Sequence, residues 1–374
     1  MQVILKLKGA SGKRFALPPQ IEKRIINAMK RNRLGVGMDY DNTMVNTDDV
    51  ARKFFAITKD KSRVIEPMGA LGMLGIPVGV FTGNKSSYIN MLCANPYRGW
   101  LLERGKVETM LRFRTYSQNS AWLQVFDENG AVIPETSKEY GKAYLFPKEH
   151  INMFRSVFRG PIQKAMPKNF MRRKPIEIRP SGSTDERHYA FGPLFENRDS
   201  VMVSWIAIHE KKPKKEPEKT RKEIIEMAIK NLNEDIRAAY RIEPGGGHSI
   251  DISHVHVEKN IGTVHFRKDM GIWRLAYFGD SVYKRRERVG NDLPVIKDPN
   301  AVVFAVNKNQ DEVPENDRVI KAGVGPNATR DWLTWLAVKY IDVRFDAAKL
   351  TNQEKTRMVD AIVMSGLIEN VEIR

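Results

Sequence analysis

Two aspartates that lie two residues apart, Asp39 and Asp41, are the clearest candidates for chemistry in this chain. They follow a short apolar run with two glycines, residues 34–38, and they precede Asn42 and Thr43. One carboxylate can attack phosphorus to give an aspartyl-phosphate, while the second can exchange protons with the leaving group and the attacking water. An Asp/Asn turn that only ends a strand would contain the same residue types. This stretch alone leaves both interpretations open.

The elements around these aspartates predict a site at the edge of a sheet. Residues 34–38 are expected to form a buried strand, and the turn after it breaks the alternation of side chains, so both carboxylates can face one site. A second strand over 76–81 runs into Thr82, Gly83 and Asn84, just before an expected helix. The Thr82 hydroxyl and the loop amides would form a phosphate cradle, although an ordinary helix N-cap explains them equally well. Open α/β sheets bind their ligands at this edge.

Length and composition predict a globular protein with anionic partners. The 374 residues are 41% hydrophobic and 29% charged, which is enough for two or three packed domains. The chain has 62 Lys+Arg and 45 Asp+Glu, which gives a net charge of +17. Such a charge favours phosphate esters, nucleic acid or an acidic membrane face as partners.

The single cysteine and the hydropathy pattern predict a cytoplasmic protein. Cys93 alone excludes an intramolecular disulfide and a cysteine-rich zinc site, and we expect it to be a small buried apolar residue. The first apolar run is too short for a signal peptide, and no stretch of about 18 apolar residues occurs. We therefore expect no membrane-spanning segment.

The order of patterns along the chain predicts an α/β core that an α+β domain interrupts. From about residue 142, alternating runs replace the first pattern, and an amphipathic helix follows over 218–233. The first pattern returns near residue 255. We expect an N-terminal lead-in over 1–33, the first part of the core over 34–145, the inserted domain over 146–254, the second part of the core over 255–325, and C-terminal helices over 326–374.

Four motifs in order resemble those of the haloacid dehalogenase superfamily. They are Asp39-Tyr40-Asp41-Asn42-Thr43, Thr82-Gly83-Asn84, Lys259, and Gly279-Asp280 with Gly290-Asn291-Asp292. The Asn129-Gly130-Ala131 turn and a domain between the second and third motifs resemble the branch with a late-inserted (C2-type) cap. That branch includes sugar-phosphate phosphatases and eukaryotic-type phosphomannomutases. The resemblance covers residues 34–307 and implies a Rossmann-like parallel sheet with an inserted α+β cap.

The resemblance also implies a role for each motif residue. Asp39 would be the nucleophile and Asp41 the general acid/base, with the Asp41 backbone carbonyl on Mg²⁺. Thr43, Thr82, Gly83 and Asn84 would bind the phosphoryl group, and Lys259 would neutralise the charge that it shares with Asp39. Asp280 would be the second carboxylate on Mg²⁺, with Asn291 and Asp292 in or behind the coordination shell. Magnesium prefers such hard oxygen ligands.

Two departures from the phosphomannomutases bear on the activity. The loop between the two parts of the fourth motif is long and basic, from Lys284 to Arg288, and the cap arginine signature is reduced to Glu177-Ile178-Arg179. Arg179 and Arg187 are the cap residues that we expect to face substrate, although a solvated polar loop would also contain them. A mutase needs arginines that hold a second phosphate, so their scarcity favours water as the phosphoryl acceptor.

These features predict a Mg²⁺-dependent phosphatase that acts on a small phosphorylated metabolite, most simply a sugar phosphate. A hexose phosphomutase is the first alternative. A nucleic-acid phosphatase or binding protein is the second, with the basic runs 211–215 and 284–288 along a phosphate backbone. Neither run has interleaved aromatic residues, so base stacking is not favoured. The pattern predicts neither the substrate nor the oligomeric state.

Overall fold

The structure is a computed structural model whose contacts divide the chain into two compact units. The first unit is formed by residues 1–138 and 258–374, and the second by residues 139–257. The second unit is therefore inserted into the sequence of the first. The structure describes residues 3–7, 15–46, 64–84, 86–141, 146–165, 193–194, 202–206, 217–244, 249–285, 288–347 and 350–373.

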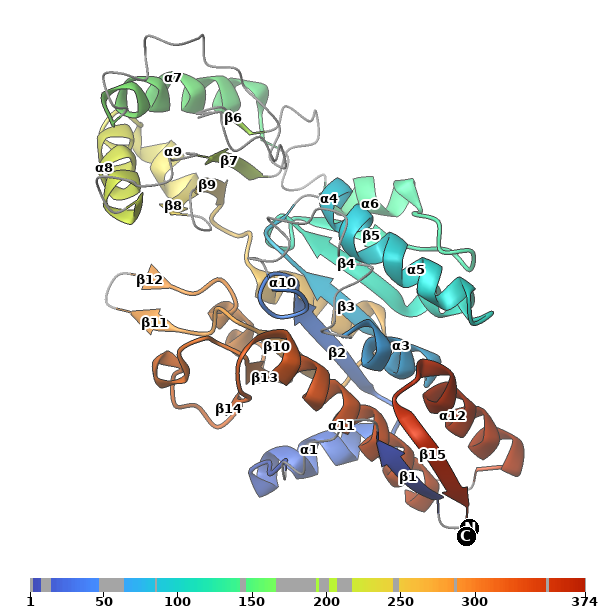
Figure 1. Ribbon diagram of the computed structural model, residues 1–374. Coiled ribbons are helices and arrows are strands. Elements are labelled where there is room, and N and C mark those ends of the chain that lie inside the picture. The colour runs from blue at the N-terminus through green and yellow to red at the C-terminus, as the bar shows by residue number, and fades with distance from the viewer. Residues whose placement is uncertain are drawn as a thin grey trace. The chain divides into compact units, whose positions relative to one another are not determined.

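A seven-stranded sheet forms the centre of the first unit (Figure 1). Its order is β14 (Val319–Lys321), β13 (Ala301–Ala305), β10 (Arg274–Gly279), β2 (Leu34–Asp39), β3 (Val78–Phe81), β4 (Phe113–Ser117) and β5 (Trp122–Val125). The first six strands are parallel, and β5 is antiparallel to β4. This arrangement confirms the predicted Rossmann-like α/β core.

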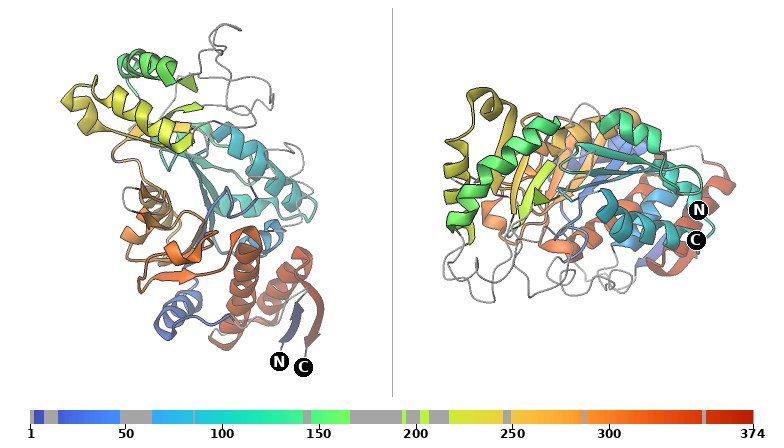
Figure 2. Two further views of the ribbon diagram at one scale, coloured as in Figure 1. Left: turned by 60° about the vertical axis from the view of Figure 1, so that its left-hand side comes forward. Right: turned by 90° about the horizontal axis from the view of Figure 1, so that it is seen from above.

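The central strands are apolar along their whole length because helices cover the sheet. Every residue of β2, β3 and β13 is buried, as is usual for parallel sheets. The described helices of this unit are α1 (Pro19–Lys30), α3 (Ile65–Met73), α4 (Ser86–Ile89), α5 (Asn95–Leu102), α10 (Lys259–Asp269), α11 (Gly325–Ala347) and α12 (Asn352–Ser365), and α6 (Pro134–Gly141) crosses the boundary to the second unit. Figure 2 shows α11 and α12 beside the core, where α11 packs against both α1 and α3.

Shorter helical segments complete the connections of the first unit. A π-helical turn, η2 (Asn90–Ala94), joins α4 to α5, and it carries the buried Cys93 thiol, whose pKa burial raises to about 12. The sequence prediction of a buried cysteine is therefore confirmed. Among the described residues, the 3₁₀ segments are η3 (Val107–Arg112), η5 (Leu293–Lys297) and η6 (Gln310–Glu312).

Two strand pairs lie outside the main sheet in the described part of the first unit. Near the chain ends, β1 (Val3–Leu7) pairs antiparallel with β15 (Ile368–Ile373). A hairpin of β11 (Lys284–Arg285) and β12 (Arg288–Val289) leaves the main sheet after β10. In the part of the chain that the structure describes, every helix is too short or too polar to cross a lipid bilayer.

The second unit has its own antiparallel sheet and its own apolar core. The sheet order is β6 (Pro193–Leu194), β7 (Met202–Ile206), β9 (Ser249–His254) and β8 (Tyr240–Pro244). The helices α7 (Lys148–Ala165), α8 (Pro217–Ile229) and α9 (Glu234–Ala239) accompany it. Phe154, Phe158, Ile224 and Ile252 are buried together, which explains the amphipathic pattern of α8. This unit is therefore an α+β fold by itself.

The C-terminal helix α12 offers a direct test of local stability. The Thr351 hydroxyl accepts a hydrogen bond from the Glu354 amide at 3.2 Å, and the Glu354 carboxylate accepts one from the Thr351 amide at 2.8 Å. We predict that Thr351→Ala lowers the free energy of unfolding by about 1 kcal/mol, because the capping box is lost. Chemical denaturation would measure this change.

The matched control is Thr356→Ala, at an exposed position inside the same helix. Alanine has the higher helix propensity, so this variant should be neutral or slightly more stable. Equal losses in both variants would contradict the assigned role of the cap.

Candidate active site

Three neighbouring strands of the first unit bring the candidate residues to one edge of the sheet. Asp39 is the last residue of β2, Thr82 follows β3, and Asp280 follows β10. The parallel register pairs Asp39 with Phe81 and Met38 with Phe278. The carboxyl ends of these strands therefore meet, as in other open α/β sheets that bind ligands.

A buried ion cluster joins the first, third and fourth motifs. The Lys259 Nζ donates to Asp39 Oδ1 at 2.6 Å and to Asp292 Oδ1 at 2.7 Å. Lys259 is 1% exposed, and it is the first residue of α10. Burial alone would lower the pKa of Lys259, but Asp292 and Asp39 raise it above its usual value. The lysine therefore stays charged in the folded protein.

Tyr277 is a member of this cluster that the sequence analysis missed. Its hydroxyl donates to Asp292 Oδ1 at 2.7 Å, and the Ser281 amide donates to Asp292 Oδ2 at 2.9 Å. Burial, followed by the charge of Asp292, raises the pKa of Tyr277 well above its usual value, so the phenol remains a neutral donor. A tyrosine within the apolar part of the strand, residues 275–278, is the one signal that could have found it, since a buried hydroxyl needs a partner.

Gly279 allows Asp292 to approach the sheet. A Cβ atom at this position would lie 2.6 Å from the Asp292 Cγ atom. The glycine of the predicted Gly279-Asp280 motif is therefore required by packing. The same close approach leaves Asp292 fully buried.

Three carboxylates of the cluster fit a hard divalent cation. One oxygen from each of Asp39, Asp280 and Asp292 lies within 4.8 Å of the others. Oxygen donors of this kind suit Mg²⁺. Because both Asp292 oxygens accept hydrogen bonds from protein groups, this residue is better suited to stand behind the first coordination shell. Asn291 is exposed, beside the buried Asp292.

The negative charge of the cluster exceeds what Lys259 can balance. Burial raises the pKa of Asp39 well above its usual value, and Lys259 opposes this only in part. Burial and Asp292 raise the pKa of Asp280 to about 6. Ser281 donates to Asp280 at 3.1 Å and lowers that pKa, as does a hydrogen bond from Asn42. A bound divalent cation would remove this excess of negative charge.

Asp41 is held by the loop after β3. The Asn84 side-chain amide donates to Asp41 Oδ2 at 2.6 Å and to Thr82 Oγ1 at 3.1 Å, and the Asn84 backbone amide also donates to Thr82 Oγ1. Burial raises the pKa of Asp41, against the opposing effects of Asn84 and Lys259. A raised pKa favours the protonated form that a general acid needs. Asn84 thus contacts the candidate acid directly, in addition to lying in the predicted phosphate loop.

A turn over residues 118–120 supports two parts of the site together. The Asn119 amide donates to the Thr82 carbonyl at 2.9 Å, and the Ser120 hydroxyl donates to the Lys259 carbonyl at 3.4 Å. Gln118, Asn119 and Ser120 all have left-handed backbone conformations, with φ of 52°, 55° and 74°. Since such conformations are costly for residues other than glycine, this turn is a strained support for the site.

Thr43 lies in the turn after Asp41, and its side chain is completely buried. Its Oγ1 has no hydrogen-bond partner among the described residues. Buried hydroxyl groups are rarely left in this state, so the atom is available to a ligand. Arg179 and Arg187, the two cap residues selected from sequence, lie outside the described residues.

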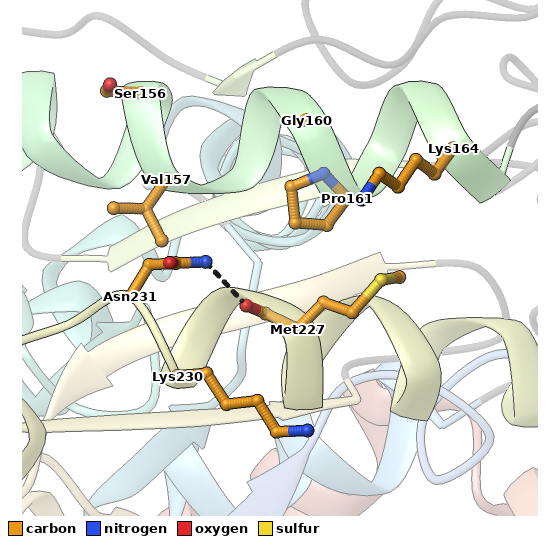
Figure 3. A pocket seen from close by; sticks show the side chains of 8 residues that line it. All are labelled: Ser156, Val157, Gly160, Pro161, Lys164, Met227, Lys230 and Asn231. Atoms are coloured by element: carbon orange, nitrogen blue, oxygen red, sulfur yellow. Dashed lines mark hydrogen bonds between the residues drawn. The ribbon is translucent and has the colours of Figure 1, made fainter.

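The second unit has a groove of its own, between α7 and α8 (Figure 3). Its volume is about 540 Å³, and its lining includes two lysines and no acidic residue. It therefore lacks the carboxylates that the chemistry at the sheet edge requires. The lining residues are Ser156, Val157, Gly160, Pro161, Lys164, Met227, Lys230 and Asn231.

Comparisons with known proteins find similar folds at low sequence identity. The chain matches no protein-family model, and it matches no curated protein sequence. It resembles an N-terminally truncated IMP-nucleotidase from Plasmodium falciparum, with 14% identity and a TM-score of 0.49 over 87% of this chain and 78% of the other. At these values the likeness does not assign an activity.

Two further solved structures are similar over most of the chain. A trehalose-6-phosphate phosphatase from Aspergillus fumigatus has 10% identity and a TM-score of 0.41, over 87% of this chain and 98% of that one. A sucrose-phosphatase from Synechocystis, solved with sucrose and phosphate, has 11% identity and a TM-score of 0.38, over 81% and 98%.

The raised pKa of Asp280 predicts a pH-dependent stability of the metal-free protein. Its value of about 6, against 3.8 for an ordinary aspartate, means that folding favours the protonated carboxyl. The stability that this group contributes is present below about pH 4 and is lost as the pH rises through 6. At pH 7 the ionised group costs about 3 kcal/mol. With a chelator present, Asp280→Asn should therefore raise the melting temperature at pH 7 to 8.

The same variant should gain nothing at pH 4, where Asp280 is already protonated. Added Mg²⁺ should stabilise the wild-type protein and have much less effect on the variant, because one carboxylate ligand is missing. Thermal melts at each pH, with and without Mg²⁺, measure both effects. A variant that is less stable than wild type at pH 8 in chelator would contradict the assignment.

Proposed function

We propose that this protein is a Mg²⁺-dependent phosphatase of the haloacid dehalogenase type, acting on a small phosphorylated metabolite through an aspartyl-phosphate. One observation carries the proposal: buried Asp39 is hydrogen-bonded to buried Lys259, while Asn84 holds Asp41 at the same edge of the sheet. A nucleophile, an acid and a fixed positive charge are thus available to one phosphate ester.

In the first half-reaction, Asp39 attacks phosphorus. We assign the attack to Oδ2, because Oδ1 accepts the hydrogen bond from Lys259. The new bond joins Asp39 Oδ2 to phosphorus as the ester P–O bond breaks. Protonated Asp41 gives its proton to the departing alcohol oxygen, which its raised pKa favours. Lys259 and the Thr82 loop stabilise the charge on the phosphoryl oxygens.

In the second half-reaction, water is the acceptor. Asp41, now a carboxylate, takes a proton from water as the water oxygen bonds to phosphorus. The bond between phosphorus and Asp39 breaks, and inorganic phosphate leaves. Asp39 is then a free carboxylate again, and Asp41 is again protonated. The Asn84 amide keeps Asp41 oriented through both steps.

Asp39 and Asp280, with the Asp41 carbonyl, would hold Mg²⁺, and Asp292 would orient Lys259 behind them. When bound, the ion supplies positive charge that relieves the repulsion between a dianionic ester and the carboxylate nucleophile. The substrate class, a small phosphate ester such as a sugar phosphate, is supported by the motif resemblance and by the net charge of +17.

We predict that Asp39→Asn abolishes phosphate release, by at least about 10³-fold, because a carboxamide is nearly isosteric but is a poor nucleophile. The measurement is a phosphate-release screen over sugar phosphates, nucleotides and phosphorylated oligonucleotides with Mg²⁺. Asp360→Asn, at an exposed position in α12, is the matched control and should keep wild-type rates. Substantial turnover by the Asp39 variant would refute the nucleophile.

We predict that Asp41→Asn slows turnover of sugar phosphates by about 10² to 10⁴-fold, the usual contribution of general acid–base catalysis. With p-nitrophenyl phosphate, whose leaving group needs little protonation, the first half-reaction should survive while hydrolysis of the intermediate stays slow. Rapid mixing should then show a burst of p-nitrophenol that approaches one equivalent of enzyme. If activity toward both substrates falls to the same degree and no burst occurs, this role of Asp41 is contradicted.

A further inference from the structure

Five arginines lie around the amino end of β10, and the proposed chemistry uses none of them. Arg274 is the first residue of β10, and Asp280 of the candidate active site comes six positions later, just after the same strand. Because a strand rises about 3.3 Å per residue, about 20 Å separates these two residues along the sheet. We call the five residues the arginine group, and its members are Arg24, Arg31, Arg267, Arg274 and Arg318.

Side-chain contacts join three members of the group. Arg24 Nη1 and Arg318 Nε lie 3.9 Å and 3.7 Å from the two carboxylate oxygens of Asp317. Arg318 Nη1 also donates to the Asp298 carbonyl at 2.7 Å, and Arg267 donates to the Asp298 carboxylate from Nε at 2.6 Å and from Nη2 at 3.1 Å. Side chains from α1, from α10 and from the turn before β14 therefore meet at one place.

The loop after Asp298 holds Arg274 at the same place. The Arg274 Nη1 atom donates to the Pro299 carbonyl at 3.2 Å and to the Asn300 side-chain oxygen. The Trp273 ring lies beside it, with its centroid 5.4 Å from the Arg274 guanidinium and 4.8 Å from that of Arg31. Cation–π contacts and hydrogen bonds to the backbone thus hold these guanidinium groups in position.

The arginine group carries more positive charge than its acidic partners balance. Among the described residues, the carboxylates in contact with the group are Asp298 and Asp317. Asp298 is 1% exposed, and Arg267 binds both of its carboxylate oxygens. The Asp317 side chain is 67% exposed, and its contacts with arginine are longer than hydrogen bonds, so they contribute little. Five guanidinium groups thus face two carboxylates.

The surroundings of Arg274 reflect this excess. Burial is the main cause that lowers the pKa of Arg274, and the positive charges of Arg24 and Arg267 follow. Arg318 lowers this pKa as well, while Asp298 opposes the shift. An anion bound among these side chains would replace repulsion by attraction. Guanidinium groups are suited to phosphate, which they bind through two parallel hydrogen bonds.

We propose that the arginine group binds the phosphate backbone of nucleic acid, without base specificity, at the edge of the sheet opposite the candidate active site. Guanidinium groups from separate elements of the first unit suit a row of phosphates, and the net charge of +17 favours a polyanion. The Trp273 ring contacts two guanidinium groups, which favours readout of phosphate over base stacking. This activity is separate from the proposed phosphatase activity.

A lipid surface fits the arginine group less well than nucleic acid. In the part of the chain that the structure describes, none of the exposed large hydrophobic side chains lies on α1, α10 or β10. A protein that binds a membrane surface needs such side chains next to its basic residues in order to enter the lipid. The group therefore offers charge without an apolar anchor.

The test measures binding of a fluorescent DNA duplex of about 20 base pairs by anisotropy, over a series of salt concentrations. The duplex has no terminal phosphate, so it offers no phosphate monoester to the candidate active site, and its base faces are covered. For wild type we expect log affinity to fall linearly with log salt, with a slope of roughly −3 to −5, since each phosphate contact contributes about −0.9.

The double variant Arg24→Gln/Arg31→Gln should weaken binding by roughly tenfold or more at about 0.1 M salt and make the slope shallower by about 2. The matched control is Lys222→Gln/Arg237→Gln, which removes the same charge from two exposed positions of the second unit and should change the affinity by less than about twofold. Thermal melts check that both variants are folded. Phosphate release should be unchanged in both, because neither pair belongs to the candidate active site.

Three outcomes would overturn the inference. The first is no binding of the duplex by wild type at low salt, and the second is binding that the Arg24/Arg31 variant leaves unchanged. The third is tighter binding of polyglutamate, or of vesicles that contain phosphatidylserine, than of the duplex, which would assign the group to an acidic protein or to a membrane. Each outcome is independent of whether any substrate releases phosphate, so failure here is distinguishable from failure of the phosphatase proposal.

Discussion

The candidate site depends on one buried positive charge, that of Lys259. A lysine that is 1% exposed can remain charged only if anions lie next to it, and Asp39 and Asp292 accept its hydrogen bonds at 2.6 and 2.7 Å. Those anions need donors in turn, which Tyr277 and Ser281 provide for Asp292. The position of Asp292 in turn requires a glycine at position 279, because a Cβ atom there would collide with the Asp292 side chain. One electrostatic requirement thus fixes residues from two strands, a helix and a loop.

Much of this arrangement could be predicted because it depends on short local patterns in the sequence. Continuous apolar runs at residues 34–38 and 76–81 indicated buried parallel strands, and polar residues directly after them indicated one shared edge. The order of four short motifs indicated which polar residues would meet. The chemistry of Asp39, Asp41 and Lys259 stays a prediction, although their proximity is what that chemistry requires.

The remaining features could not be predicted, because they are set by contacts between distant residues. Tyr277 looks like an ordinary sheet aromatic until its hydroxyl meets Asp292. The turn at Gln118, Asn119 and Ser120 contains two common turn residues but no glycine, so three successive left-handed conformations are not predicted by its sequence. Strand β4 is fully buried although four of its five residues are arginine, threonine, tyrosine and serine. The charge of Arg114 is balanced by a salt bridge from its Nε atom to Asp269 Oδ2 at 3.0 Å. Apolar patterning does not identify such a strand.

The interrupted order of the first unit also constrains how the chain can be made. Lys259 and Asp39 are separated by 220 residues, and β2 has β10 as a neighbour in the sheet. During synthesis, the contiguous residues 139–257 of the second unit leave the ribosome before β10 and β13 exist. The edge of β2 that pairs with β10 therefore stays unpaired until the second unit has been synthesised. Contacts between residues so far apart in sequence also form slowly. The contact between Asp39 and Lys259 is for this reason formed late, and misfolding would begin at the open edge of the half-formed sheet.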